Sequence, residues 1–132
     1  MTHDHQYTTG IIRIKNLLLR TYVGINPDEK SKKQDVLINL AIRCDERLLH
    51  AKEGRIDQTL DYKKVVKTII PFVEENRFEL LEVMTRQVLD LVMSFDGVQW
   101  AQVEIDKPHA IRFAESVSIT LQAQRPPSPK TA

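Results

Sequence analysis

The sequence predicts a single α+β domain with the element order ββααββ, in which a four-stranded antiparallel sheet carries two helices on one face. Three observations predict this fold. Apolar residues alternate with polar ones in two stretches before residue 46, recur at helical spacing between residues 62 and 95, and alternate again in two stretches after residue 100. The length of 132 residues fits one domain. We expect a folded body at 10–124 between disordered tails at 1–9 and 125–132.

The first two predicted strands form a long hairpin. In residues 11–25 the alternation changes phase after Asn16, which predicts a β-bulge. Residues 35–45 alternate almost without interruption. The connection at 24–34 is too long and too polar for a tight turn, and loops of this kind often carry function. A short amphipathic piece at 46–59 follows the hairpin.

Two long helices are predicted next. The first spans residues 62–75, with Asp61 as its N-cap and with Pro71 as a residue that should kink it. The second spans residues 80–95 and is closed by Gly97 as a C-cap glycine. Both have apolar residues three or four positions apart, so each helix is expected to bury one face.

Two more alternating strands, at 101–105 and 117–121, complete the sheet. The outward positions of the last strand are uncharged and polar: Ser116, Ser118, Thr120 and Gln122. A sheet with helices on one face leaves two open edges, and open edges invite pairing with another chain. We therefore expect a closed ring of subunits joined edge to edge, with these polar residues lining its interior.

Charge and cysteine content exclude several function classes. The formal net charge is only +1, which argues against nucleic-acid binding, as does the lack of paired aromatic residues on the strands. Cys44 is the single cysteine, and His3 and His5 lie in the N-terminal tail, so we expect no disulfide and no metal site. No apolar stretch is long enough for a membrane span, and no signal peptide is evident, so the expected location is the cytoplasm.

Taken singly, the candidate functional residues have ordinary explanations. Glu29 and the basic run Lys30–Lys33 are typical of a solvated loop. Glu82, in the first turn of a helix, interacts favourably with the helix dipole. Tyr62 is typical of a half-buried ring at a helix start, and Lys107 of a polar residue that ends a strand. None of them identifies a reaction alone.

Read together, four stretches resemble one family: RIKNLLLRTYVGINPDE, TLDYKKV, NRFELLE and VEIDKPHAIRFAESVSI. In this order and spacing they are similar, from Ile11 to about Leu121, to the dihydroneopterin aldolase and dihydroneopterin triphosphate 2'-epimerase family. The resemblance implies the tunnelling fold, in which four subunits close a barrel and two rings stack as a homo-octamer. It also implies active sites between neighbouring subunits and an enzyme that needs no metal and no cofactor.

The resemblance assigns the pterin-binding residues. Glu82 falls on the family's carboxylate, which accepts an amino group and a ring N–H of the pterin in a two-point contact. Leu81 positions that carboxylate. Main-chain groups at Leu60 and Asp61 are expected to complete the ring's polar edge across the subunit boundary.

The resemblance also assigns the catalytic residues. Lys107 and Tyr62 are expected to transfer protons, and Glu29 to orient the lysine or the substrate hydroxyls. The dihydropterin's own C=N bond accepts electrons when the adjacent carbon–carbon bond of the substrate's side chain breaks. If the aldehyde turns over and adds back before it leaves, the product is an epimer.

The segment KPHAIRFAESVS favours the triphosphate-epimerase branch, because a glycine often follows Lys-Pro in the aldolase branch. His109, Arg112 and Lys30–Lys33 are candidates for the phosphates, although Arg112 could instead pair with a carboxylate and the lysines could face solvent. The expected reaction is epimerisation at C2' of 7,8-dihydroneopterin 3'-triphosphate to dihydromonapterin triphosphate, with residual aldolase activity. The alternatives are an aldolase that releases 6-hydroxymethyl-7,8-dihydropterin and glycolaldehyde, and a non-catalytic pterin binder.

Overall fold

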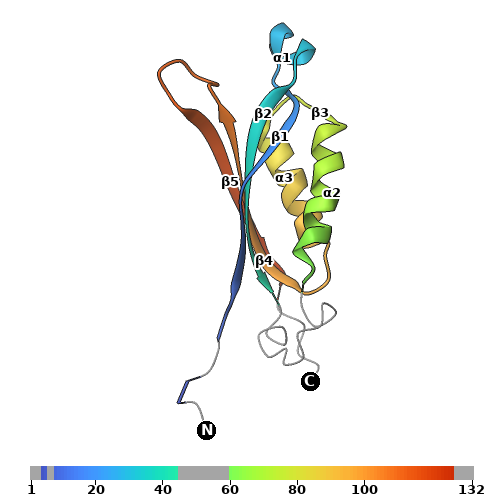
Figure 1. The fold of residues 1–132 in the computed structure, drawn as a ribbon, viewed down its shortest axis with the longest axis vertical. Helices are drawn as coiled ribbons and strands as arrows, with labels where there is room; N and C mark the ends of the chain where they lie inside the picture. The colour runs from blue at the N-terminus through green and yellow to red at the C-terminus, as the bar shows by residue number, and fades with distance from the viewer. Residues whose placement is uncertain (1–3, 6–7, 45–59, 127–132) are drawn as a thin grey trace.

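The structure, a computed structural model, describes residues 4–5, 8–44 and 60–126. Its elements are β1 (Ile11–Val23), α1 (Pro27–Ser31), β2 (Gln34–Cys44), α2 (Tyr62–Glu74), β3 (Arg77–Phe78), α3 (Leu81–Met93), β4 (Val98–Pro108) and β5 (Ser116–Gln124). The long strands form a curved sheet, and α2 and α3 cover one of its faces (Figure 1). The prediction of an α+β domain with two long helices on one face of a sheet is therefore confirmed.

The sheet has five strands in the order β3-β1-β2-β4-β5, and not four. The additional strand, β3, has two residues and pairs parallel to β1, whereas the other pairs are antiparallel. The prediction of a purely antiparallel four-stranded sheet was wrong in this respect. Two residues are too few to produce an alternation of apolar and polar positions.

The β-bulge of β1 lies where the sequence predicts it. The register with β2 shifts between Ile14 and Leu17, and Asn16 takes a φ of 54°, in the left-handed region that asparagine tolerates. The Asn16 N–H donates to Oδ1 of Asn39 at 2.8 Å. The bulge changes the phase of the strand, so that Leu19 is buried although it lies an odd number of positions from Ile14.

The polar connection between β1 and β2 contains a one-turn helix, α1, which was not predicted from the sequence. Pro27 stands at its first position, where the fixed φ of proline suits a helix. The backbone N–H of Asn26 donates to Oε1 of Glu29 at 3.3 Å, which satisfies a donor at the helix start. The sequence Asn-Pro-Asp-Glu was therefore the available signal.

The predicted starts of the two long helices match the structure better than their predicted ends. Oδ1 of Asp61 accepts hydrogen bonds from the N–H groups of residues 63 and 64, at 3.1 and 3.4 Å, so the predicted N-cap of α2 is confirmed. α2 continues past Pro71 and ends at Glu74. In α3 the C-cap is Ser94, so the prediction of Gly97 as the cap was wrong. Gly97 takes a φ of 87° in the turn before β4.

The hydrophobic core lies between the sheet and the two long helices. Its deeply buried side chains come from the long strands and both long helices. They include Val23 of β1, Val36, Ile38 and Ile42 of β2, Val65, Ile69 and Val73 of α2, Met84, Val88 and Val92 of α3, and Val103 and Ile105 of β4. No helix among the described residues is long and apolar enough to cross a membrane.

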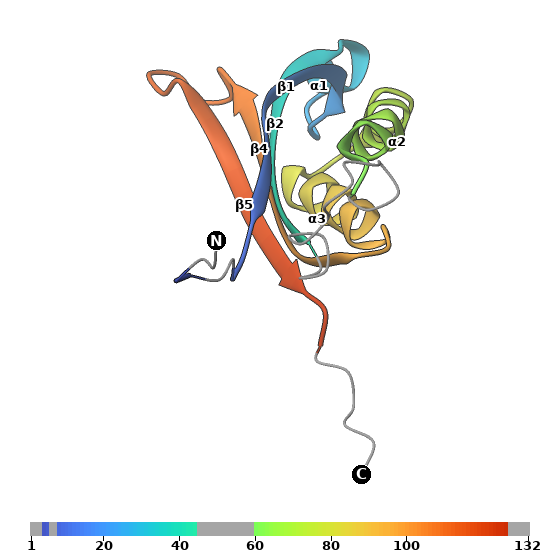
Figure 2. The same ribbon diagram turned by 60° about the horizontal axis from the view of Figure 1, so that its bottom comes forward.

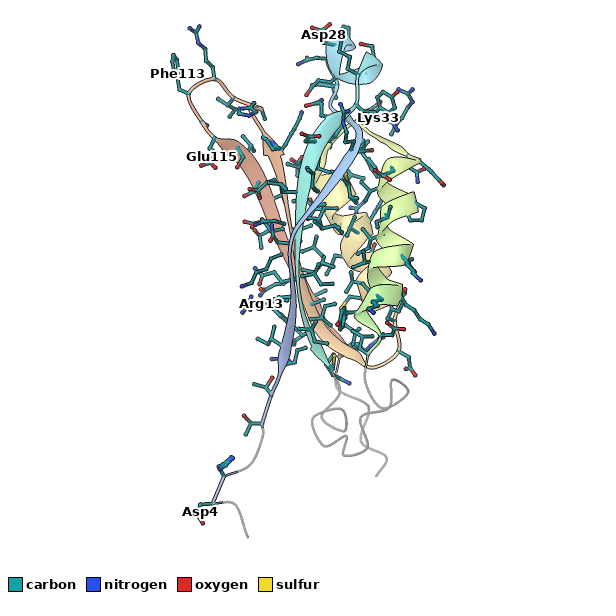
Figure 3. All side chains as sticks on the ribbon, viewed as in Figure 1. Asp4, Arg13, Asp28, Lys33, Phe113 and Glu115 are labelled. Carbon is teal, nitrogen blue, oxygen red and sulfur yellow. The ribbon has the colours of Figure 1, made fainter. Side chains whose placement is uncertain are left out.

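On the opposite face of the sheet, the part of the chain that the structure describes places no helix (Figure 2). Arg13, which Figure 3 shows pointing away from the helices, lines a hollow on this face together with Asn39 and Glu104. Ser118 and Thr120 are exposed here, and their hydroxyls donate to Oε2 of Glu104 at 3.4 and 3.3 Å. The outward polar face predicted for the last strand is therefore present.

The predicted amphipathic piece at 46–59 and most of both predicted tails lie outside the described residues. Arg125, the first residue of the predicted C-terminal tail, is held against the body. Its N–H donates to Gln99 O at 2.9 Å and its Nε to Val98 O at 2.7 Å.

Candidate active site

At the end of the sheet that carries α1, Lys107 and Glu29 meet as a largely buried ion pair. Nζ of Lys107 donates to Oε2 of Glu29, and the two side chains are 13% and 20% exposed. The hydrogen bond from Lys107 is the main cause that lowers the pKa of Glu29 from its ordinary 4.5, with a smaller contribution from the Asn26 N–H, while partial burial opposes it. Glu29 is therefore ionised at neutral pH and its charge is matched by the lysine.

Gly24 allows the Glu29 carboxylate to lie against the backbone. A Cβ at Gly24 would come within 2.2 Å of the carboxylate carbon, and Gly24 takes a φ of 137°, which L side chains rarely adopt. The Gly24 N–H donates to Phe78 O at 2.9 Å. One glycine thus brings the end of β1, the glutamate and β3 together.

A cavity of about 270 Å³ opens beside Glu29. Tyr22, Lys30, Arg77 and Glu79 also line it. The guanidinium carbon of Arg77 lies 3.7 Å from the centroid of the Tyr22 ring, and Nη1 of Arg77 donates to Lys30 O at 2.7 Å. Arg77 is not among the site residues predicted from the sequence, although it belongs to the stretch NRFELLE that carries part of the family resemblance.

Glu82 and Leu81 start α3 at the same end of the molecule. Two residues separate β3 from α3, so the first turn of α3 follows directly on Phe78, which contacts Gly24. Leu81 is 8% exposed and belongs to the core, whereas the side chain of Glu82 is exposed. The core therefore fixes the position of this turn, and the carboxylate of Glu82 is accessible.

Tyr62, Leu60 and Asp61 lie at the opposite end of the molecule. The 13 residues of α2 separate Tyr62 from β3, a length of about 20 Å at 1.5 Å per residue (Figure 1). Tyr62 is 49% exposed and borders another cavity, of about 680 Å³, beside Ile14 of β1. The structure therefore brings Lys107 and Glu29 together but does not bring Tyr62 to them within this chain.

His109 and Arg112 belong to the loop between β4 and β5, and both are exposed. The guanidinium carbon of Arg112 lies 4.9 Å from the ring of Phe113, a residue that Figure 3 places at the tip of this loop. Phe113 is 96% exposed. Among the described residues, no group of three or more His, Cys, Asp and Glu side chains is arranged to hold a metal ion.

Comparison with known proteins agrees with this architecture. A dihydroneopterin triphosphate 2'-epimerase of Pseudomonas aeruginosa is 53% identical over 118 residues, which cover 86% of this chain and 92% of that protein. The protein of the same name from Escherichia coli is 49% identical over 116 residues, covering 88% and 96%. The crystal structure of E. coli dihydroneopterin aldolase in complex with neopterin matches with a TM-score of 0.80 at 25% identity, covering 86% of this chain and 98% of that one.

The dihydroneopterin aldolase family model matches residues 12–122, which include most of the sheet and both long helices. The chain has the tunnelling fold that the resemblance implied, and its sheet also contains the short strand β3. The chain thus belongs to the dihydroneopterin aldolase family.

Proposed function

We propose that the protein is an isomerase that epimerises C2' of 7,8-dihydroneopterin 3'-triphosphate, giving dihydromonapterin triphosphate. The observation that carries this proposal is the largely buried Glu29–Lys107 pair at the end of the sheet, in which the Lys107 amine lies against a carboxylate. We propose that this amine transfers protons. The identities support the epimerase branch, because the two relatives with that name are 53% and 49% identical and the aldolase is 25% identical.

Glu82 is proposed to bind the pterin ring. An ionised carboxylate accepts hydrogen bonds from the ring's amino group and adjacent N–H side by side, which fixes the ring in its plane. Leu81, buried in the core, holds the first turn of α3 in position for this contact. The neopterin complex of the E. coli aldolase supports a pterin as the ligand class.

The bond-breaking step needs protons moved at two places. A proton leaves the 2'-hydroxyl and one is delivered to the ring nitrogen, while the electrons of the broken C1'–C2' bond move into the ring's C=N bond. The products are an aldehyde and an enamine-like ring. We assign these proton transfers to Lys107 and Tyr62, and Glu29 orients Lys107 through their ion pair. Rotation of the held aldehyde and re-formation of the bond then yield the epimer.

Tyr62, Leu60 and Asp61 are proposed to act on the site of a neighbouring subunit. Support comes from their position about 20 Å along α2 from the end that carries the ion pair. Support also comes from β5, which lies at one edge of the sheet, since a ring of subunits would pair such edges. We propose a homo-octamer of two stacked rings that works in the cytoplasm. His109 and Arg112 are proposed phosphate contacts.

Chromatography of the products formed from dihydroneopterin and from its triphosphate tests the reaction. We expect the triphosphate to be converted to its epimer, with 6-hydroxymethyl-7,8-dihydropterin and the triphosphate ester of glycolaldehyde as minor products. A preference for the unphosphorylated compound with stoichiometric glycolaldehyde would make the protein an aldolase. Neopterin binding without turnover of either compound would make it a pterin binder.

A further inference from the structure

The cavity beside Glu29 carries positive charge that the proposed chemistry does not use. Lys30 and Arg77 line it, and Nζ of Lys33 lies 5.9 Å from the centroid of the neighbouring Tyr22 ring. We propose that this cavity, of about 270 Å³, holds the phosphate groups of the substrate and that Arg77 is their anchor. The inference rests on the proposed function, because it assigns a second part of the same substrate to a second part of the same site.

Arg77 is held in a fixed orientation. Its guanidinium stacks on Tyr22 at 3.7 Å, and its Nη1 donates to Lys30 O at 2.7 Å. Among the residues that the structure describes, these are the contacts of the guanidinium, so Nε and Nη2 can donate to phosphate oxygens. A planar guanidinium presents such donors in a fork that matches a phosphate group. Because stacking has already restricted the side chain, binding costs little additional conformational entropy.

The backbone of Arg77 is fixed as well. Arg77 is the first residue of β3 and pairs with Tyr22 of β1, the residue on which its side chain stacks. Arg112, which we propose as a further phosphate contact, belongs to an exposed loop and stacks on Phe113, which is itself exposed, so it is a weaker candidate for the anchor. A guanidinium on paired strands specifies the position of an anion better than one on a loop tip.

The charge balance of the cavity also suits an anion. The negative charge of Glu29 is matched by Lys107, so it does not repel a phosphate at full strength. The lining then has two positive charges, on Lys30 and Arg77, and one further negative charge, on Glu79. The cavity therefore attracts a polyphosphate, and the negative charge of Glu79 weakens this attraction.

The test compares kcat/KM for dihydroneopterin triphosphate with kcat/KM for dihydroneopterin. We expect Arg77→Gln to lower the ratio of the two values about 10- to 100-fold, mainly through KM for the triphosphate. Arg86→Gln, which removes an exposed arginine of α3, is the matched control and should leave the ratio unchanged. An unchanged ratio in Arg77→Gln, or a loss in Arg112→Gln alone, would overturn the inference.

Calorimetric titration with inorganic tripolyphosphate tests the cavity without catalysis. The full-length protein should bind it, Arg77→Gln should bind it about 10-fold more weakly, and Glu79→Gln should bind it more tightly. Arg77→Lys keeps the charge but not the fork, so it should give an intermediate affinity even if the glutamine variant does not fold. If wild type turns over neither pterin, the proposed function fails, but weaker tripolyphosphate binding by the variants still supports the anchor. Equal affinities in wild type and both Arg77 variants would rule the anchor out.

Discussion

Glu29 and Lys107 are 78 positions apart in the sequence, and their side chains form an ion pair because of the register of three strands. In the antiparallel order β1-β2-β4, the end of β1, the start of β2 and the end of β4 meet at one end of the sheet. Asp106, the neighbour of Lys107, pairs with Leu37, the fourth residue of β2. A shift of one residue in this register would turn Lys107 to the other face of the sheet.

Loss of the amine should abolish most of the activity. We expect Lys107→Ala to lower kcat by a factor on the order of 10² to 10⁴, the usual effect of removing a proton-transfer group, while neopterin still binds through Glu82. Glu29→Gln should lower kcat by a smaller factor, since it only loosens the orientation of Lys107. Lys64→Ala, which removes an exposed lysine of α2, is the control. Near-normal turnover by Lys107→Ala would contradict the assignment.

The ion pair should also make stability depend on pH in acid. The pKa of Glu29 is lower in the folded state than its ordinary 4.5, chiefly because of the hydrogen bond from Lys107. The folded state therefore binds fewer protons than the unfolded state around and below this pH. The stabilisation is fully present above 4.5 and is lost as the pH falls through the folded-state pKa.

Urea unfolding of wild type and Glu29→Gln across the acidic range measures this dependence. The free energy of unfolding should fall more steeply with decreasing pH in wild type than in the variant, at equal protein concentration. Parallel curves for the two proteins would mean that Glu29 has no lowered pKa in solution.

Gly24→Ala should damage the site more than the fold. The new Cβ would meet the Glu29 carboxylate, and the positive φ adds strain of about 1 to 3 kcal/mol. Gly97→Ala is the matched control, because Gly97 also has a positive φ but lies in the turn before β4. Both variants should lower the free energy of unfolding, and only Gly24→Ala should lower kcat of the folded protein. Equal kcat values would show that the carboxylate can move without consequence.

Periodicity predicted the parts of the fold that have enough residues to show a pattern. The long strands, the bulge at Asn16 and the N-cap Asp61 follow from local rules and are found. α1 escaped because its five residues are too few to show a helical period, although Asn-Pro-Asp-Glu is a local signal for its start. β3 escaped because it is held by tertiary contacts, such as Gly24 N–H to Phe78 O, and not by propensity. The stacking of Arg77 on Tyr22 escaped for the same reason, since it depends on a parallel pairing of distant segments.

Thr21 should stabilise the contact between β1 and the end of α2, next to the candidate site. Its fully buried hydroxyl donates to Val73 O at 2.6 Å and lies 3.1 Å from Asn76 O, so it satisfies the Val73 carbonyl, which lies in the last turn of α2. Thr21→Val keeps the shape and should lower the free energy of unfolding by about 1 to 3 kcal/mol. Thr68→Val, which removes an exposed hydroxyl of α2, should change it little. Thermal unfolding of both variants distinguishes these outcomes.

Mixing two inactive variants tests whether Tyr62 acts across a subunit boundary. Tyr62→Ala and Lys107→Ala should each lose activity in a uniform assembly. After the two are unfolded together and refolded, a Tyr62→Ala subunit that still has Lys107 can lie beside a Lys107→Ala subunit that still has Tyr62. Random mixing then restores about a quarter of the sites, whereas mixing without refolding restores none. If Tyr62 acted on Lys107 of its own subunit, no mixture would regain activity, because every subunit would carry one defect.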